Sequence, residues 1–453
     1  SKLASFFARA NYTLADRYLL TLSVRRDGSS RFGPDNQWGT FPAAALAWRV
    51  NEEAFLDNLD WLSDLKLRAS WGVNGNQSFG DYLWISTYRY SDEAARVQFG
   101  DEFINTIRPS AVDPNIKWEE TTSWNVGVDY GFFDDRITGS LEYYLKDTDD
   151  LIFNVPVAAG TNFSDRVTTN IGSVRNQGLE FSLNAGLLQG DRSGLNWDVS
   201  FNAARNQNEL LTISGAGGVN QILVGGIAGG VGSNIQVLRP GQAVNSFLVY
   251  RHIRENGKPI YKDRQGVDNN GKFTNKPDGQ INEQDLYEDI NGDGQITEAD
   301  RRIFENPTPD WIFGHTSNVT YGNFDLGFTL RAYLGNYVYN NLASNRGNYR
   351  ELLATGSPEN LHRSVLETGF LTPQYFSDVY VEDASFLRMD NITLGYVLPR
   401  FRGVQRMRVF GTVQNAFTLT GYDGVDPTAG LNGIDNNIYP RSRTFTVGVN
   451  VDF

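Results

Sequence analysis

The carboxy-terminal segment of the chain alternates between apolar and polar side chains almost without exception. Arg443 and five apolar residues share one face of an extended strand, while threonine, glycine, asparagine and aspartate share the other; the five are Phe445, Val447, Val449, Val451 and Phe453. Successive side chains of a strand point to opposite faces. In a soluble protein the apolar face would enter a core. In an outer-membrane barrel it would face lipid, and the polar face would line the lumen.

The same alternation recurs along the whole chain. It predicts strands at residues 18–24, 124–130, 137–145, 179–183, 324–334, 392–398 and 407–413. The opposite faces carry charges, which a wet lumen tolerates better than a dry core; examples are Arg25, Asp129, Glu142, Glu180 and Arg408. The pattern therefore favours an all-β fold, a transmembrane antiparallel β-barrel, over a large soluble β-sandwich or propeller.

Composition gives further information on the class of protein and its partners. The 453 residues include no cysteine, which fits an exported protein. No segment approaches the roughly 18 continuous apolar residues of a membrane helix, so any membrane span would be a strand. The net charge of −13 argues against nucleic acid as a partner.

Connection lengths predict the topology of the barrel. Short connections at 14–17, 132–136, 321–323 and 399–404 are expected to be periplasmic turns. Long stretches at 28–37, 75–114, 148–173, 209–310, 339–384 and 418–442 are expected to be extracellular loops. Counting between them gives about 13 spanning strands.

An odd number of strands has a consequence for closure. The first and last strands would run in the same direction, and they could not close an antiparallel barrel by pairing with each other. We therefore expect another polypeptide or segment to carry the missing strands. The chain also starts at Ser1 in strand-like sequence without a signal peptide, so an exported precursor is expected to have lost its amino end.

Several sequence blocks, in order along essentially all of residues 1–453, resemble the SusC/RagA class of TonB-dependent outer-membrane transporters. They are YLLTLSVRRDGSSRFG (18–33), LKLRASWGVNGNQ (65–77), NIKWEETTSWNVGVDYGFFDDRITGSLEYYLKDTDDLI (115–152), NIGSVRNQGLEFSLN (170–184), NPTPDWIFG (306–314), SFLRMDNITLGYVLP (385–399) and VFGTVQNAFTLTGYDGVDP (409–427). The resemblance implies a barrel of about 22 strands, of which this chain would supply the carboxy-terminal part. The plug domain of the family has no counterpart here.

The same resemblance implies a function. Such a barrel imports nutrient oligomers, glycan or peptide, across the outer membrane of a Gram-negative bacterium. A SusD-like surface lipoprotein would act as a lid, and TonB would supply energy through a plug not in this chain. The alternative is a SusC-like barrel that serves as a passive or scaffolding component of a surface assembly. Outer-membrane lipid is a partner in either case.

A calcium-loop motif stands out within the largest predicted loop, 209–310. The segment DINGDGQITEAD at 289–300 has oxygen ligands at the expected positions, with a glycine at position 6: Asp289, Asn291, Asp293, Gln295 through its backbone carbonyl, and Asp300. Aspartate replaces the usual glutamate at position 12, so a modest Ca²⁺ affinity is expected. The alternative is a solvated turn without metal. A half-copy at 278–285 would place a lysine at a ligand position and is interpreted as degenerate.

No catalytic constellation is visible in the sequence. The three histidines His252, His315 and His362 lack metal-ligand spacing, and there is neither a cysteine nucleophile nor a GxSxG elbow. Catalysis is therefore not expected. A soluble calcium-binding adhesin would explain residues 289–300 but not the repeated lipid-like faces. Several loop aromatics could line a ligand cavity: Tyr82, Trp84, Tyr88, Tyr90, Tyr349 and Tyr375.

Overall fold

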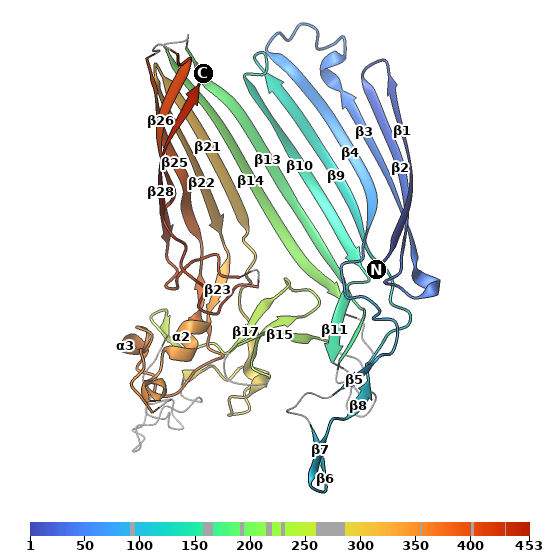
Figure 1. Ribbon diagram of the computed structural model, residues 1–453, viewed down its shortest axis with the longest axis vertical. Helices are drawn as coiled ribbons and strands as arrows, with labels where there is room; N and C mark the ends of the chain where they lie inside the picture. Colours follow the sequence, from blue (N-terminus) through green and yellow to red (C-terminus); the bar gives the residue numbers. More distant parts are fainter. Residues whose placement is uncertain are drawn as a thin grey trace. The chain divides into compact units, whose positions relative to one another are not determined.

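The computed structural model (Figure 1) describes residues 1–90, 96–156, 166–190, 194–213, 220–227, 232–259, 286–353, 356–399, 403–430 and 432–453. Thirteen long strands form one sheet in the order β1-β2-β3-β4-β9-β10-β13-β14-β21-β22-β25-β26-β28. The predicted all-β fold and the count of 13 spanning strands are thereby confirmed. Their bounds are β1 Leu3–Leu14, β2 Tyr18–Ser29, β3 Trp38–Arg49, β4 Leu62–Asn76, β9 Glu119–Phe132, β10 Ile137–Asp149, β13 Ser173–Gln189, β14 Leu195–Thr212, β21 Trp311–Tyr321, β22 Phe324–Leu334, β25 Phe386–Leu398, β26 Arg406–Thr420 and β28 Thr444–Asp452.

The chain divides into two compact units. The first comprises residues 1–185, 206–222 and 239–242, and the second comprises 186–205, 223–238 and 243–453. In each unit the long strands lie side by side, and the smaller strands lie at one end of them (Figure 1). Within each unit, the connections that contain the smaller strands therefore leave the long strands at one end. Among the described residues, no helix has the length and apolar character needed to cross a membrane.

Strand pairing in the first unit brings apolar residues into continuous rows. One row crosses seven neighbouring strands and consists of Tyr12, Leu20, Leu46, Ala69, Val126, Tyr143 and Leu179. Several of these side chains remain exposed, including Val126 at 58%. Because a strand slip of one residue would turn the row to the other face, the register is strongly specified.

The second unit repeats this arrangement. Its apolar row is Leu195, Tyr321, Phe324, Tyr396, Val409 and Val449. Val447 on β28, two residues along from Val449, is 81% exposed. A broad apolar surface of this kind on both units is typical of the lipid-facing side of a barrel.

The opposite face of the sheet is polar and carries ion pairs. In the first unit Asp129 lies 2.8 Å from the Lys66 ammonium and 3.2 Å from the Arg68 guanidinium, which also contacts Glu142 at 2.6 Å. In the second unit Arg408 donates from Nε to Asp325 over 2.8 Å. Charges in this number need water or partners. The two faces therefore have the chemistry of a lipid-facing surface and a lumen.

Smaller elements build the long connections. Pairs of short strands are β5 Tyr88–Tyr90 with β8 Ile107–Pro109, β6 Val97–Phe99 with β7 Glu102–Ile104, β11 Ile152–Pro156 with β12 Arg166–Asn170, and β18 Arg254–Glu255 with β19 Lys258–Pro259. Larger groups are β15 Ile222–Gly226, β16 Asn234–Leu238, β17 Ser246–Val249 and β20 Arg302–Ile303, and a second set of β23 Tyr337–Asn340, β24 Val381–Asp383 and β27 Ile434–Asp435. The short helices include α2 Asn341–Arg346 and α3 Val365–Thr368.

These connections have an apolar core of their own in the second unit. Phe247, Tyr339 and Phe370 are fully buried in it together with Ile235 and Val249. β17 belongs to these connections, because it pairs with β16 and β20 rather than with the thirteen-stranded sheet. The small sheets β15-β16-β17-β20 and β24-β23-β27 and the helices near them are therefore packed around this apolar core, and together they are called the platform.

Candidate functional site

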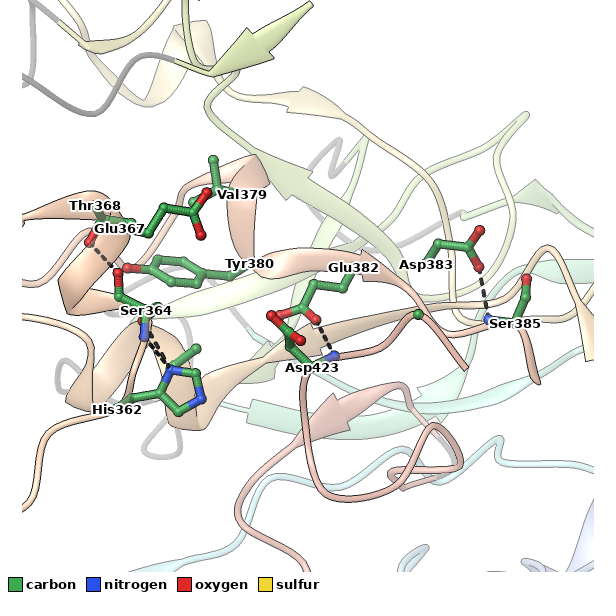
Figure 2. A pocket seen from close by; sticks show the side chains of 12 residues that line it. His362, Ser364, Glu367, Thr368, Val379, Tyr380, Glu382, Asp383, Ser385 and Asp423 are labelled. Atoms are coloured by element: carbon green, nitrogen blue, oxygen red, sulfur yellow. Dashed lines mark hydrogen bonds between the residues drawn. The ribbon is translucent and has the colours of Figure 1, made fainter. Parts of the chain in front are cut away.

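A cavity of about 430 Å³ opens in the platform of the second unit (Figure 2). Three parts of the chain supply most of its lining: residues 362–368 around α3, residues 379–385 around β24, and Gly421 with Asp423 after β26. These segments are far apart in the sequence. The antiparallel pairing of β23 with β24 and the loop that follows β26 bring them together.

Carboxylates dominate the polar lining of this cavity. Glu382 accepts hydrogen bonds from the Asn340 amide and from the backbone N–H of Asp423, both over 2.9 Å. Burial raises the pKa of the Glu382 carboxyl above its ordinary value, and these two hydrogen bonds oppose the rise. Asp383 accepts from the backbone N–H of Ser385 over 2.8 Å, and Glu367 lies across the cavity (Figure 2).

His362 supplies the imidazole of the cavity. Its Nδ1 lies 2.9 Å from the Ser364 hydroxyl. Burial lowers the pKa of His362 below its ordinary value, and the neighbouring Arg363 adds to the effect. The lowered pKa favours the neutral imidazole, and stability is lost as the pH falls below the ordinary histidine range towards this lowered pKa, because the unfolded chain then binds the proton more readily.

The lining suits a polar ligand that donates hydrogen bonds. Four carboxylates, two serine hydroxyls and a neutral imidazole offer acceptors, and Tyr380 and Val379 add an apolar wall. Across the part of the chain that the structure describes, the segment 289–300 included, no three His, Asp or Glu side chains are already gathered as a group that could hold a metal ion. The acceptors of this lining give the cavity the character of a binding site for hydroxyl or ammonium groups.

The predicted calcium loop is compact in the structure. Asp289 accepts backbone hydrogen bonds from Gly292 over 2.7 Å and from Gly294 over 2.8 Å, and Asp293 accepts from Gln295 N–H over 2.8 Å. Both glycines have left-handed backbones, with φ of 74° and 81°. Glycine adopts this conformation without steric cost. The loop thus has the sharp turn that the motif requires.

Asp300 joins the two ends of this loop. Its side chain is fully buried and accepts from the backbone N–H groups of Ile290 over 2.9 Å and Thr297 over 2.8 Å. The Thr297 N–H is the main reason that the pKa of Asp300 is below its ordinary value, and burial opposes it. This stabilisation is present at neutral pH and is lost as the pH falls through the lowered pKa. The half-copy at 278–285 lies outside the described residues.

Sequence reasoning missed the cavity itself. Of the predicted cavity aromatics, Tyr82, Trp84, Tyr88, Tyr349 and Tyr375 are not among its lining residues, and the Tyr90 side chain lies outside the described part of the structure. Trp84 instead packs near Phe32 in a separate apolar cluster of the first unit. The residues that do line it, such as His362, Glu382 and Asp423, have no shared spacing that could have identified them. Only the folded loops bring them together.

Comparison with known proteins agrees with this architecture. Residues 1–226 match a family model described as TonB dependent receptor-like, beta-barrel. Over its whole length the chain is 41% identical to the TonB-dependent receptor SusC of Bacteroides thetaiotaomicron, of which it covers 44%. It is 31% identical to the TonB-dependent receptor P3 of Formosa agariphila, of which it covers 46%.

The chain belongs to the TonB-dependent receptor β-barrel family.

A solved structure has the same fold. The structure of the RagAB peptide transporter superposes on the whole chain with a TM-score of 0.77 at 24% sequence identity, and 48% of the RagAB chain is covered. The chain thus spans about half the length of the relatives it matches. Membership of this receptor family places its barrel strands in the outer membrane, with the apolar rows towards lipid. The predicted resemblance, fold class and location are thereby confirmed.

Proposed function

We propose that this chain is the carboxy-terminal part of a SusC-like barrel that imports nutrient oligomers across the outer membrane. The observation that carries the proposal is the 41% identity to the receptor SusC in an alignment that covers the whole chain. The polar, ion-paired face of the sheet supports it, because such a face can line a path for hydrophilic solutes. Catalysis has no part in this function.

Energy and partners would come from outside this chain. By its family, the import would depend on TonB acting through a plug domain, and a SusD-like surface lipoprotein would close over the long connections. The cavity of Figure 2 lies among those connections in the second unit. It is a reasonable first contact for hydroxyl-rich or amine-bearing oligomers, whether glycan or peptide.

Growth on defined oligomers tests the import proposal. Deleting the protein that carries this chain is expected to abolish growth on at least one oligosaccharide or oligopeptide as sole carbon source. Growth on the corresponding monomer should persist, because monomers do not need a large gated channel. Deleting TonB should reproduce the defect. Unchanged growth on every oligomer, with the surface lipoprotein lost from the cell, would instead support the scaffolding alternative.

We also propose that the loop at 289–300 binds Ca²⁺ through Asp289, Asn291, Asp293, Gln295 and Asp300. The two turn-forming carboxylates support this proposal, since each of their oxygens retains a second lone pair for an ion. The described hydrogen bonds also suit a turn without metal. A measurement on the protein itself must therefore decide.

Limited proteolysis of the loop provides that measurement. At 1 mM Ca²⁺ and a dissociation constant of about 0.1–1 mM, the ion would stabilise the closed loop by about 0.4–1.4 kcal/mol. Chelation is therefore expected to speed nicking of the loop by roughly 2- to 10-fold. Replacing Asp289 and Asp293 together with alanine should remove the calcium effect, whereas Glu298→Gln, at a position that is not a ligand, should retain it. Nicking that ignores calcium in the unmodified protein would exclude the site.

A further inference from the structure

A second cavity, of about 560 Å³, lies where the pairing of β25 with β26 is irregular. The register shifts between Met389 and Asn391, and Asn415 on β26 has a left-handed backbone with φ of 51°. The lining comes from both strands, from the segment before β28 and from the first residue of β28, and it includes Arg388, Asp390, Asn415, Tyr439, Pro440 and Arg441. Most of its lining residues are polar, and Tyr439 and Pro440 add apolar surface.

The cavity is on the polar face of the sheet. Arg388 alternates with Leu387 and Met389, which pair with the apolar residues Ala332 and Leu330 of β22. Arg388 therefore points to the side that lines the lumen. β-bulges often re-aim side chains in this way at functional sites.

Arg388 is an unusual residue in this position because it is almost completely buried, with 2% of its surface exposed. Its Nη2 donates to Asp426 over 2.8 Å and its Nε donates to the Thr418 hydroxyl over 3.0 Å. Its Nη1 has no hydrogen-bond partner among the described residues. Leaving a buried N–H group unpaired costs about 1–3 kcal/mol, and more when the group is charged.

Neighbouring charges do not supply the missing acceptor. Asp426 already accepts from Arg388, from Arg441 Nε over 2.9 Å and from Thr428 N–H over 2.8 Å. Burial opposes the ionisation of Asp426, but hydrogen bonds from the Thr428 hydroxyl, Arg388 and the Thr428 backbone hold its pKa below its ordinary value, so it is charged at neutral pH. The other carboxylate, Asp390, pairs with Arg331 over 2.9 Å.

The balance of charge around the cavity is positive. Three guanidinium groups, of Arg388, Arg441 and Arg331, face two carboxylates, of Asp426 and Asp390, which leaves one excess positive charge. A planar guanidinium with a spare N–H is suited to bind a carboxylate. Three features therefore indicate a carboxylate ligand: the buried N–H group without a partner, the polar lining of the cavity and the excess positive charge.

We propose that this cavity binds a carboxylate group of an oligomer entering the lumen, with Arg388 as its specific donor and Arg441 at its rim. Because Nη1 is covered, the carboxylate reaches it after a lining side chain shifts. Arg441, whose side chain is 54% exposed, is free enough to do so. The proposal rests on the proposed import function and names acidic oligomers, uronic-acid glycans or peptides with free carboxylates, as its substrate class.

Binding of matched acidic and neutral probes tests this assignment. The protein that carries this chain, purified in detergent as the complete complex, is titrated with an N-acetylated hexapeptide bearing a free carboxyl terminus and with its terminal amide. A second pair, hexagalacturonate and its methyl ester, distinguishes a glycan source from a peptide source. In one of the two pairs the acid is expected to bind about tenfold more tightly than the neutral form. Raising the salt concentration should reduce that preference.

Variants distinguish a role of Arg388 in ligand binding from a purely structural role through its contacts with Asp426 and Thr418. Arg388→Gln is expected to bring the ratio of acid to neutral affinity close to one, whereas a structural role would weaken both probes equally. Arg441→Gln should reduce the ratio in part. It serves as the second variant if Arg388→Gln does not assemble, because its side chain is already half exposed. Arg408→Gln, which removes a polar-face arginine that pairs with Asp325 and does not line this cavity, should leave the ratio unchanged.

Two outcomes overturn the assignment: equal affinity for acid and neutral forms in both pairs, or no binding of either acid. The growth assay on oligomers measures import independently of this binding assay. If the cell imports the oligomer but the protein binds acid and neutral probes equally, only the carboxylate site is rejected. If the protein prefers the acid probes but the cell does not import the oligomer, only the transport proposal is rejected.

Discussion

Replacing Val126 with arginine is expected to prevent the barrel from assembling in the outer membrane. Val126 lies near the middle of β9, is more than half exposed, and pairs with Ala69 and Tyr143 in the apolar row of the first unit. A charge on the lipid face at mid-membrane costs about 2–4 kcal/mol. The expected result is loss of the heat-modifiable, folded species from outer-membrane fractions on an unheated gel.

The adjacent residue provides the matched control. Asn125 is on the polar face, where its amide donates to the Ser70 hydroxyl over 3.4 Å, so Asn125→Arg should assemble normally. An arginine there enters water among other polar groups and pays little desolvation cost. Equal assembly of both variants would mean that the apolar rows do not face lipid.

The second large effect concerns closure of the barrel. β1 and β28 are the two ends of the strand order, so each is paired on one side only within the described sheet. The strands alternate in direction, and the five-residue connection between β13 and β14 is too short for a parallel crossover. The two edge strands therefore run the same way. Unpaired edges cannot persist in lipid because their amides lack partners.

An odd number of further strands is therefore expected to complete the barrel, about nine if the family count of 22 applies. A polypeptide or segment that ends in such strands should pair with the free edges of Leu3–Leu14 and Thr444–Asp452. Without it, this chain is expected to aggregate or to be degraded rather than to form a stable pore.

The sequence predicted the membrane strands well because lipid enforces a strict physical rule. A strand between lipid and water must alternate, and each segment with that pattern, such as 324–334, is a strand of the sheet. The irregularity in β25 is also visible in the sequence, as a change in the alternation of apolar residues. Apolar residues occupy odd positions at Leu387 and Met389 and even positions at Ile392 and Leu394, as expected when one extra residue is inserted.

The long connections were much less predictable. Their small sheets, such as β15-β16-β17-β20, pair over two to five residues, too few for a pattern to emerge. Both cavities combine residues that are tens of positions apart, as Arg388 and Arg441 are. The calcium motif could be recognised because all its ligands are local, but local sequence does not distinguish a bound ion from a tight turn.

The mass of the intact barrel shows whether this chain needs further polypeptide to close. Native mass spectrometry of the barrel purified from outer membranes, followed by denaturation, measures which polypeptide mass accompanies the 50.6 kDa of this chain. We expect every closed barrel to contain additional polypeptide, either covalently continuous with this chain or released from it on denaturation. A sealed, heat-modifiable barrel with a total protein mass of 50.6 kDa would contradict the account.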